Sequence, residues 1–383
     1  MLSASACDGS GGNAGGSIVR DSAGITIVEN DHTRPALSEA AAWKVSAEPT
    51  VRIGTVSGDS TQQLFQVSHS RRLADGRIAV VNSGSAEVRL FDSAGRYLNA
   101  IGGRGEGPGE FRAPWAVHQI QGDSVLVIDL YREISIFDAD GKFARRFLPE
   151  RPEGFVLGEG FEPVGAFGDG SLLFRSHYRE QGEGLRRTRI QMIRTLLDGS
   201  FGGSLGDFDD QTIMSGVMYM FGPWAREAPT DSTMWYGPGD RFEIREIAFD
   251  GTVRRLIRLD RPATPVTESD IAAFKESVVE RVRGTRSEEI TNRRLAEAQF
   301  AAEFPAHYEL MVDADNNLWV QDYQAFNTRN PRTWTVFAPD GRFLGNVVIP
   351  AGVFVHEIGS DYILGKWTDE LDVEYVVLHR LDK

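Results

Sequence analysis

Four of the seven histidines lie in or beside segments that we expect to be inner strands of the fold: His69, His118, His307 and His356. Imidazole groups can coordinate a metal ion or bind a ligand. His118 and His356 occupy matching places, since each precedes an apolar residue of the next strand by seven positions. The same count back from Ile78 reaches Arg71 instead of His69. Because the histidines do not all share one position, we expect them to be ordinary polar residues that line the central channel, and we assign no metal ligands.

Large aromatic residues stand at expected strand starts and in loops on one face: Trp115, Tyr219, Phe221 and Trp224. They either form a recognition surface or pack between neighbouring sheets, where large side chains are commonly buried. From the polar and aromatic groups together we select five candidate ligand-binding residues: Arg71, Trp115, His118, Trp224 and His356.

No catalytic residue is predicted. The chain has no H-E-x-x-H motif and no cysteine outside its N-terminal tail. The glycine-rich stretch 101–111, IGGRGEGPGEF, lacks dinucleotide-binding and Walker spacings and leads into β-forming residues. Residues 313–317, DADNN, begin like a calcium loop, but Leu318 and Gln324 replace the required glycine and glutamate. A hairpin turn is therefore expected there.

Acidic residues outnumber basic ones, which gives a formal net charge of −14 at pH 7. This sign argues against nucleic acid and anionic membrane surfaces as partners. No segment approaches the ~18 consecutive apolar residues that a transmembrane helix needs.

The single cysteine, Cys7, follows small residues in a pattern that resembles the end of a bacterial lipobox. A Gly/Ser-rich stretch follows it, as in a flexible tether. Only six residues precede Cys7, fewer than a signal peptide needs. Two interpretations stay open: lipid attachment at Cys7, or a disordered tail with an inert thiol. Attachment would make the protein extracytoplasmic, lipid-anchored to the bacterial cell envelope or secreted, with membrane contact only through the lipid.

A turn followed by alternating apolar residues recurs six times, starting at Ala74, Gln121, Phe167, Pro229, Asp313 and Ile358. Several of these copies are followed by a second element, which consists of a strand, an Asp/Gly turn and another strand. Phe91 and Phe137 occupy the same place in two copies of this element and are 46 residues apart. A unit of this length with four short strands is typical of a propeller blade. Residues 102–110 would then join the outer strand of one blade to the inner strand of the next. Residues 51–54 would supply the missing strand of the last blade and close the ring.

Two stretches interrupt the repeat. Residues 175–224 are rich in glycine and arginine, and within them YREQGEGLRRTR (178–189) predicts a long exposed hairpin. Residues 267–304 predict two helices: Thr267 and Asp270 form a capping box, and a second helix is expected over 287–302. This insertion should lie between blades four and five, over one face of the ring.

The string GEGPGEF (105–111), followed by LVIDLYREISIFDADGKF (126–143), resembles NHL-type repeats and related six-bladed propellers of bacterial secreted proteins and lipoproteins. The resemblance implies an all-β, six-bladed β-propeller of four-stranded antiparallel blades over residues 51–383. A lipobox-like segment and tether (1–17) and an N-terminal extension (18–50) would precede it. Some similar propellers are lactonases or other enzymes with a channel calcium, and Glu162, Glu309 and Asp313 are the acidic residues expected near inner strands here.

Three functions therefore stay open, and the third of them is a purely structural component of the cell envelope. The first is a noncatalytic, monomeric, extracytoplasmic module in the periplasm or at the cell surface, with a protein or glycan on the propeller face and without a cofactor. The second is a hydrolase or lyase, lactonase-like, with a metal such as calcium in the central channel.

Overall fold

The structure is a computed structural model, and it describes residues 16–150, 161–178, 182–324 and 330–383. Cys7 lies outside these residues, so its lipid attachment stays a prediction. Within the described part of the chain, neither helix is long and apolar enough to span a bilayer.

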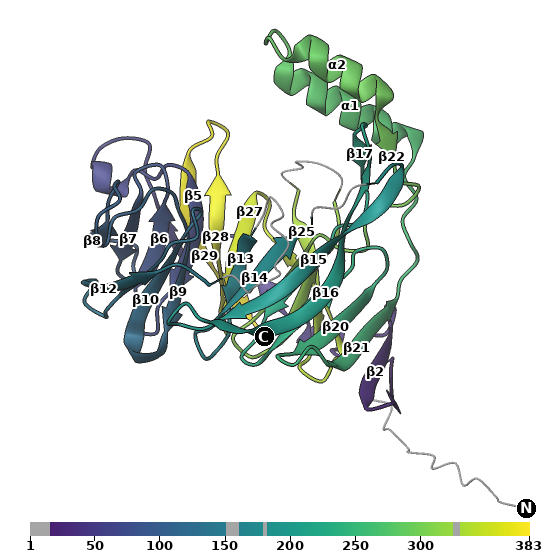
Figure 1. Cartoon of the computed structure of the whole chain (residues 1–383), viewed down its shortest axis with the longest axis horizontal. Coiled ribbons are helices and arrows are strands. Elements are labelled where there is room, and N and C mark those ends of the chain that lie inside the picture. The colour runs from purple at the N-terminus through teal and green to yellow at the C-terminus, as the bar shows by residue number, and fades with distance from the viewer. Residues whose placement is uncertain (1–15, 151–160, 179–181, 325–329) are drawn as a thin grey trace, which may run out of the picture.

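The chain forms six antiparallel sheets arranged as the blades of a propeller (Figure 1). Counted from the N-terminal side, the first sheet contains β5 (Val67–Arg72), β6 (Ile78–Asn82), β7 (Glu87–Phe91) and β8 (Tyr97–Gly102). The second contains β9 (Pro114–Ile120), β10 (Ser124–Asp129), β11 (Ile134–Phe137) and β12 (Phe143–Phe147). The third contains β13 (Phe161–Ala166), β14 (Leu172–His177), β15 (Leu185–Thr195) and β16 (Phe201–Met214).

The remaining sheets follow the same order from inner to outer strand. The fourth contains β18 (Arg226–Pro229), β19 (Thr233–Gly237), β20 (Glu243–Ala248) and β21 (Val253–Asp260). The fifth contains β23 (Glu309–Val312), β24 (Leu318–Gln321), β25 (Arg332–Phe337) and β26 (Phe343–Ile349). The sixth contains β27 (Val353–Ile358), β28 (Tyr362–Thr368) and β29 (Glu374–Asp382). Short 3-10 helices occupy Glu39–Ala41, Ser60–Gln62 and Gln121–Asp123.

The sixth sheet is completed by the N-terminal part of the chain. β4 (Val51–Ile53) pairs antiparallel with Val376–Leu378 of β29, and β3 (Lys44–Val45) pairs with the end of the same strand. Ile53 packs in one apolar cluster with residues of the first and sixth sheets, including Val67, Phe91 and Val376. Two segments distant in sequence therefore share a sheet, and the ring closes without a free edge at this seam.

Residues 16–31 add to the fourth sheet, which the repeat pattern did not foresee. β1 (Ser17–Ser22) and β2 (Ile25–Asp31) form a hairpin, and β2 pairs in parallel with β21. The buried Asn30 holds this arrangement: its amide donates to the carbonyls of Arg258 and Gly341, and its Oδ1 accepts from the backbone N–H of Phe343. One side chain thus links the hairpin to both the fourth and the fifth sheets.

The glycine-rich stretch forms the connection between β8 and β9. Phe111 N–H donates to the carbonyl of Gly103 at 2.8 Å, and its ring is buried in the core between the first two sheets. Gly102 has φ 82°, and a Cβ at this position would lie 2.1 Å from the Phe111 ring. Glycine is therefore required here because the chain crosses directly over a buried aromatic side chain.

Residues 185–214 correct a sequence prediction. The repeat was expected to be interrupted over 175–224, but β14 pairs with β15 and β15 pairs with β16 as in the other sheets. Part of the hairpin expected over 178–189, residues 179–181, lies outside the described residues. The inner part of β15 and β16 packs Ile190, Met192 and Leu205 against Met234 and Tyr236 of the fourth sheet. The repeat thus continues through this region with unusually long outer strands.

The helical insertion lies between β21 and β23, that is, between the fourth and fifth sheets. It contains α1 (Glu268–Val282) and α2 (Glu288–Glu297), and Figure 1 shows the two helices standing clear of the ring. The Thr267 and Asp270 capping box is formed. α2 ends earlier than expected, because β22 (Gln299–Phe300) pairs with β17 (Tyr219–Met220).

Replacement of Ile53 by alanine should lower the free energy of unfolding by about 2–5 kcal/mol, because it leaves a cavity in the closing seam. Ile53 is 1% exposed, whereas Ile18 on β1 is 60% exposed and provides the matched control. Ile18→Ala should change the stability by less than about 0.5 kcal/mol. Chemical denaturation measures both, and equal effects would mean that the seam does not stabilise the ring.

Candidate functional site

The first strand of each sheet lies innermost, and neighbouring inner strands contact one another. Together they enclose a central cavity of about 360 Å³, to which β5, β9, β13, β18, β23 and β27 all contribute residues. Its size is within the range of small-molecule sites. The channel of the propeller is therefore the candidate site.

The opening of this cavity is lined by exposed aromatic side chains. Trp115 and Phe354 are the second residues of β9 and β27, Tyr308 directly precedes β23, and all three line the cavity while remaining exposed. We call Trp115, Tyr308 and Phe354 the aromatic mouth. Because connections between sheets lead into the starts of inner strands, the loop 103–113 and the helical insertion emerge at this same face.

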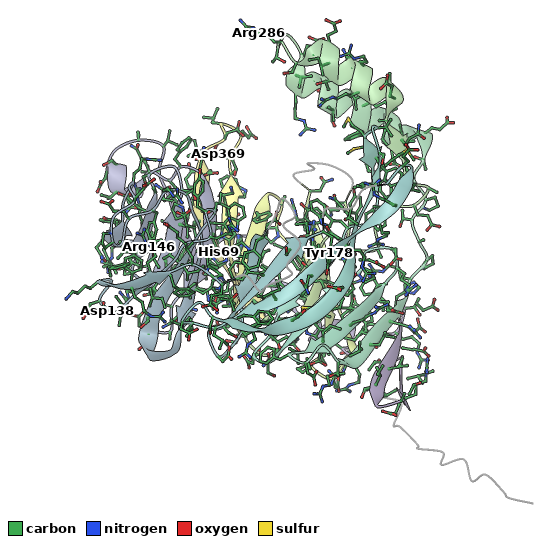
Figure 2. All side chains as sticks on the ribbon, viewed as in Figure 1. His69, Asp138, Arg146, Tyr178, Arg286 and Asp369 are labelled. Atoms are coloured by element: carbon green, nitrogen blue, oxygen red, sulfur yellow. The ribbon has the colours of Figure 1, made fainter. Side chains whose placement is uncertain are left out.

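Three histidines meet deeper in the channel. The ring centroid of His69 lies 5.5 Å from that of His118 and 5.4 Å from that of His356. His69, which is labelled in Figure 2, accepts a long hydrogen bond from Val117 N–H at Nδ1. His356 Nδ1 lies 2.8 Å from Ser70 Oγ, and its buried Nε2 has no hydrogen-bond partner among the described residues.

These imidazoles are neutral at physiological pH. Burial, followed by the nearby Arg71 charge, lowers the pKa of His69 to about 3. Burial likewise holds the pKa values of His118 and His356 well below the usual histidine range. The cluster therefore presents hydrogen-bonding groups to the channel without adding positive charge.

The sequence count placed Arg71, and not His69, in register with His118 and His356, and in the structure Arg71 and His69 both line the cavity. β5 has a register irregularity between Val67 and His69, and β27 has one between Val355 and Glu357. A β-bulge redirects side chains, so equal spacing along the sequence no longer means equal position in the channel.

Arg71 lies at the level where the channel narrows. It lines the central cavity and also a second cavity of about 250 Å³ at the other ends of the inner strands, as does His118. Its Nε is 3.3 Å from Glu357 Oε1. Glu357 is fixed in turn by the backbone N–H of Arg72 and the hydroxyl of Tyr362.

Two carboxyl groups stand on another part of the cavity wall. Glu227 accepts from Arg175 Nη1 at 3.3 Å, and burial raises its pKa to about 7. Glu309 lies 3.7 Å from Arg226 Nε, and burial also raises its pKa. Each carboxyl group thus has its own arginine, which offsets part of the cost of burying its charge.

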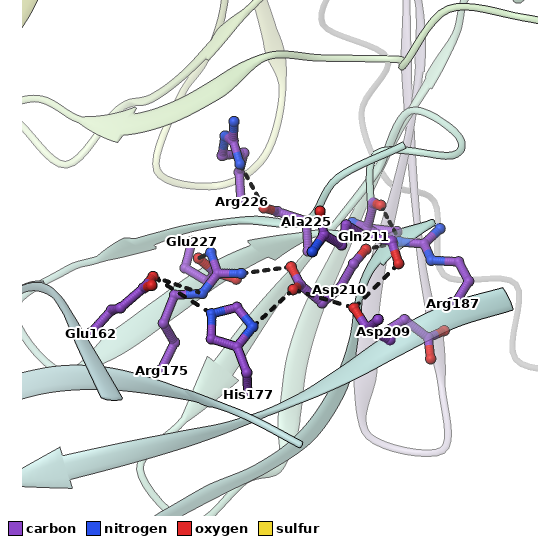
Figure 3. Close-up of polar contacts among 12 residues, drawn as sticks. Glu162, Arg175, His177, Arg187, Asp209, Asp210, Gln211, Ala225, Arg226 and Glu227 are labelled. Atoms are coloured by element: carbon purple, nitrogen blue, oxygen red, sulfur yellow. Dashed lines mark hydrogen bonds and ion pairs between the residues drawn. The ribbon is translucent and has the colours of Figure 1, made fainter. Parts of the chain in front are cut away.

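Glu227 belongs to a longer chain of charges between the third and fourth sheets (Figure 3). Arg175 Nη2 donates to Asp210 at 2.6 Å, and Asp210 also contacts His177 Nδ1 at 3.2 Å. His177 Nε2 lies 3.5 Å from the half-exposed Glu162. Its contacts with Asp210 and Glu162 raise the pKa of His177 to about 9, so it is charged at neutral pH.

The five candidate ligand-binding residues do not all lie together. Arg71, Trp115, His118 and His356 line the central cavity, although their role in binding stays a prediction. Trp224 does not line it: its exposed ring lies under the Arg226 guanidinium, 4.5 Å from the ring centroid.

Several other residues singled out in the sequence lie away from the central cavity. His307 is buried beside Gly237, and neither of its ring nitrogens has a hydrogen-bond partner among the described residues. Asp313 forms the expected turn, in which it accepts from Asn317 and Trp319. Tyr219 and Phe221 pack in the core of the helical insertion.

The calcium ligands implied by the resemblance are not assembled. Glu162 contacts His177, Glu309 contacts Arg226, and Asp313 contacts Lys383. Across the described ranges, no group of three or more His, Cys, Asp or Glu residues is arranged to hold a metal ion.

The chain contains a G-x-S-x-G motif, contrary to the expectation that it has none, but the serine has no catalytic geometry. Residues 202–206 have the spacing G-x-S-x-G, but they lie within strand β16. Ser204 Oγ contacts the carbonyl of Met192 and the side chain of Gln191. A nucleophile elbow needs a sharp turn between a strand and a helix, so this serine is not placed as one.

Sequence reasoning missed Glu227, Phe354 and the mouth position of Tyr308. The signal was available in the repeat, since Ser68, Trp115, Glu227 and Phe354 are each the second residue of an inner strand. All four line the cavity. An alignment of the inner strands by their first residues would have identified the second residue of each strand as a cavity-lining position. Counting back from the following strand did not identify it.

Residues 60–147 match the DUF5128 family, described as a 6-bladed beta-propeller. A DUF4221 family member from Bacteroides vulgatus superposes with TM-score 0.52 at 10% identity, covering 89% of this chain and 98% of that one. A candidate exported protein from Bacteroides fragilis gives TM-score 0.49 at 12% identity, covering 93% and 100%. A virginiamycin B lyase from Staphylococcus aureus gives TM-score 0.40 at 11% identity, covering 89% and 100%. The comparison with curated proteins finds no match. At these identities the likeness concerns the fold alone: the chain is a six-bladed β-propeller.

The charged contacts of His177 should make stability depend on pH. Because the pKa of His177 is raised from 6.5 to about 9, its stabilising effect is complete below pH 6.5 and is lost as pH rises to 9. His177→Gln should reduce the decline in unfolding free energy between pH 6.5 and pH 9. Urea denaturation across this range measures it, with the exposed His32→Gln as control. An unchanged decline in His177→Gln would contradict the assignment.

Proposed function

We propose that this protein is an extracytoplasmic β-propeller that binds the end of a glycan chain in its central channel. The observation that supports the proposal most is a cavity with an aromatic mouth and a polar interior. A pyranose ring has apolar C–H faces and a rim of hydroxyl groups. Trp115, Tyr308 and Phe354 offer apolar surfaces to such faces, and the histidines and carboxyl groups offer hydrogen bonds to hydroxyls.

A folded protein partner fits these features less well. Specific protein interfaces bury about 800 Å² on each partner, largely on open surface. Here the exposed aromatic side chains line a partly open cavity of about 360 Å³, which fits the end of a chain better than the surface of a folded protein. A protein bound across the whole face remains the alternative that the experiment below distinguishes.

The metal-dependent hydrolase or lyase is not favoured by an observation in the described residues. The acidic residues that such a site would use are engaged in separate ion pairs. We therefore propose binding as the primary function, carried out by a monomer without a cofactor.

The location outside the cytoplasm is supported by the sequence. Cys7 after small residues and the Gly/Ser-rich stretch after it suit a lipid-anchored protein with a tether. On this proposal the propeller is held at the cell envelope with its channel free to capture glycan ends.

Replacement of Trp115 by alanine should weaken the binding of oligosaccharides by about 10- to 100-fold, as is usual for an aromatic residue at the centre of a binding site. Trp224→Ala is the matched comparison, because Trp224 is 45% exposed and Trp115 is 46% exposed. Only Trp115 lines the cavity. Calorimetry against a panel of defined oligosaccharides measures both variants.

The comparison separates the two modes of binding. Loss in Trp115→Ala alone supports binding in the channel. Equal loss in both variants would indicate a partner spread over the face, and an unchanged affinity in Trp115→Ala would reject the proposed site.

A further inference from the structure

The wall of the channel is chemically asymmetric. His69, His118, His356 and Arg71 lie on β5, β9 and β27, whereas Glu227 and Glu309 lie on β18 and β23. We infer that the histidine and arginine wall binds the carboxylate of an acidic sugar, so that the preferred glycan end is a uronic acid. This inference rests on the proposed function and specifies its ligand class.

The histidine cluster supplies hydrogen-bond donors. His69 Nδ1 accepts from Val117 N–H, which leaves its proton on Nε2. His356 is only 6% exposed, lines the cavity, and has an Nε2 without a partner among the described residues. A buried polar atom without a partner is costly, so a ligand that supplies one gains affinity.

Arg71 supplies the positive charge. Its side chain is 40% exposed, but its Nε has almost no exposed surface and faces Glu357. Arg71 therefore meets Glu357 through its Nε, while its side chain also lines the cavity. Because Glu357 is held by Arg72 and Tyr362, it fixes Arg71 from one side. A planar guanidinium fixed in this way is suited to paired hydrogen bonds with a carboxylate.

The opposite wall sets the direction in which such a ligand enters. Glu227 and Glu309 repel a carboxylate but accept hydrogen bonds from hydroxyl groups. The acid group therefore faces Arg71, and the hydroxyl rim faces the carboxyl groups. Glu227 is surrounded by Arg175, Asp210, Arg226 and Glu309, and with its pKa near 7 it adds repulsion mainly above neutral pH.

The C-terminal carboxylate of a peptide has the same charged group but lacks the apolar ring face. The aromatic mouth favours the sugar, because three aromatic side chains surround the entrance. A peptide is therefore one of the outcomes that the experiment must distinguish.

The test compares a trisaccharide of galacturonic acid with its methyl ester, in which each carboxyl group carries a methyl group and no charge. Isothermal titration of the full-length protein at pH 6 should give at least 10-fold tighter binding of the acid. Arg71→Gln should remove this preference, because it weakens the binding of the acid more than the binding of the ester. His69→Gln should reduce the preference, which provides a second variant. Thermal unfolding verifies that each variant is folded.

Arg72→Gln is the matched control, because Arg72 is the next residue of β5 and does not line either cavity. It should keep the preference for the acid. Equal binding of acid and ester by the unaltered protein would overturn the inference and leave the proposed function standing. Binding of neither sugar would reject the proposed function and the inference together. Tighter binding of trialanine than of the acid sugar would overturn the inference in favour of a peptide.

Discussion

The pairing of β4 with β29 is the constraint on which the rest of the structure depends. Six sheets that each contact only their neighbours would form an open arc if the N-terminal strand did not complete the last sheet and pack against the first. Val51–Ile53 complete the sixth sheet, and carboxylates of that sheet also accept from the backbone of β5: Glu374 from Val67 and Glu357 from Arg72. Closure of the ring therefore fixes the position of β5 relative to β27, the inner strands on the two sides of the seam. The histidine cluster depends directly on this, since His69 and His356 come from the two sides of the seam.

Several ionisable side chains are buried or half-buried around the channel, and the fold arranges them in pairs of opposite charge. Arg175 faces Glu227, Arg226 faces Glu309, and Arg71 faces Glu357. Burial keeps the three histidines neutral, while exposed aromatic residues surround the entrance. Unpaired buried groups are rare in stable folds because they cost free energy. Among the described residues, some of the buried polar atoms without a hydrogen bond belong to side chains that line the cavity, namely Arg71, Glu227, Trp334 and His356, and others, such as the ring nitrogens of His307, lie elsewhere. The four at the cavity support the assignment of binding to it.

The architecture was predictable because its causes are local and repeated. Each blade is indicated by a turn and the apolar strand after it, as at Asp75, Asp123 and Asp169. The start of a helix is indicated by Thr267 and Asp270. The site was only partly predictable. His69 was not placed in register with His118 and His356, because bulges in β5 and β27 break the link between spacing and position. The pairing of β2 with β21 was missed since it is parallel and joins segments more than 200 residues apart, which no local pattern records.

The central claim, that the channel is where this propeller binds its partner, is tested most directly by a crystal structure of the protein soaked with a short acidic oligosaccharide. The account predicts a sugar ring against Trp115 inside the aromatic mouth, with its carboxylate at Arg71 and the histidines. Sugar bound on the outer strands or on the helical insertion, with an empty channel, would contradict it.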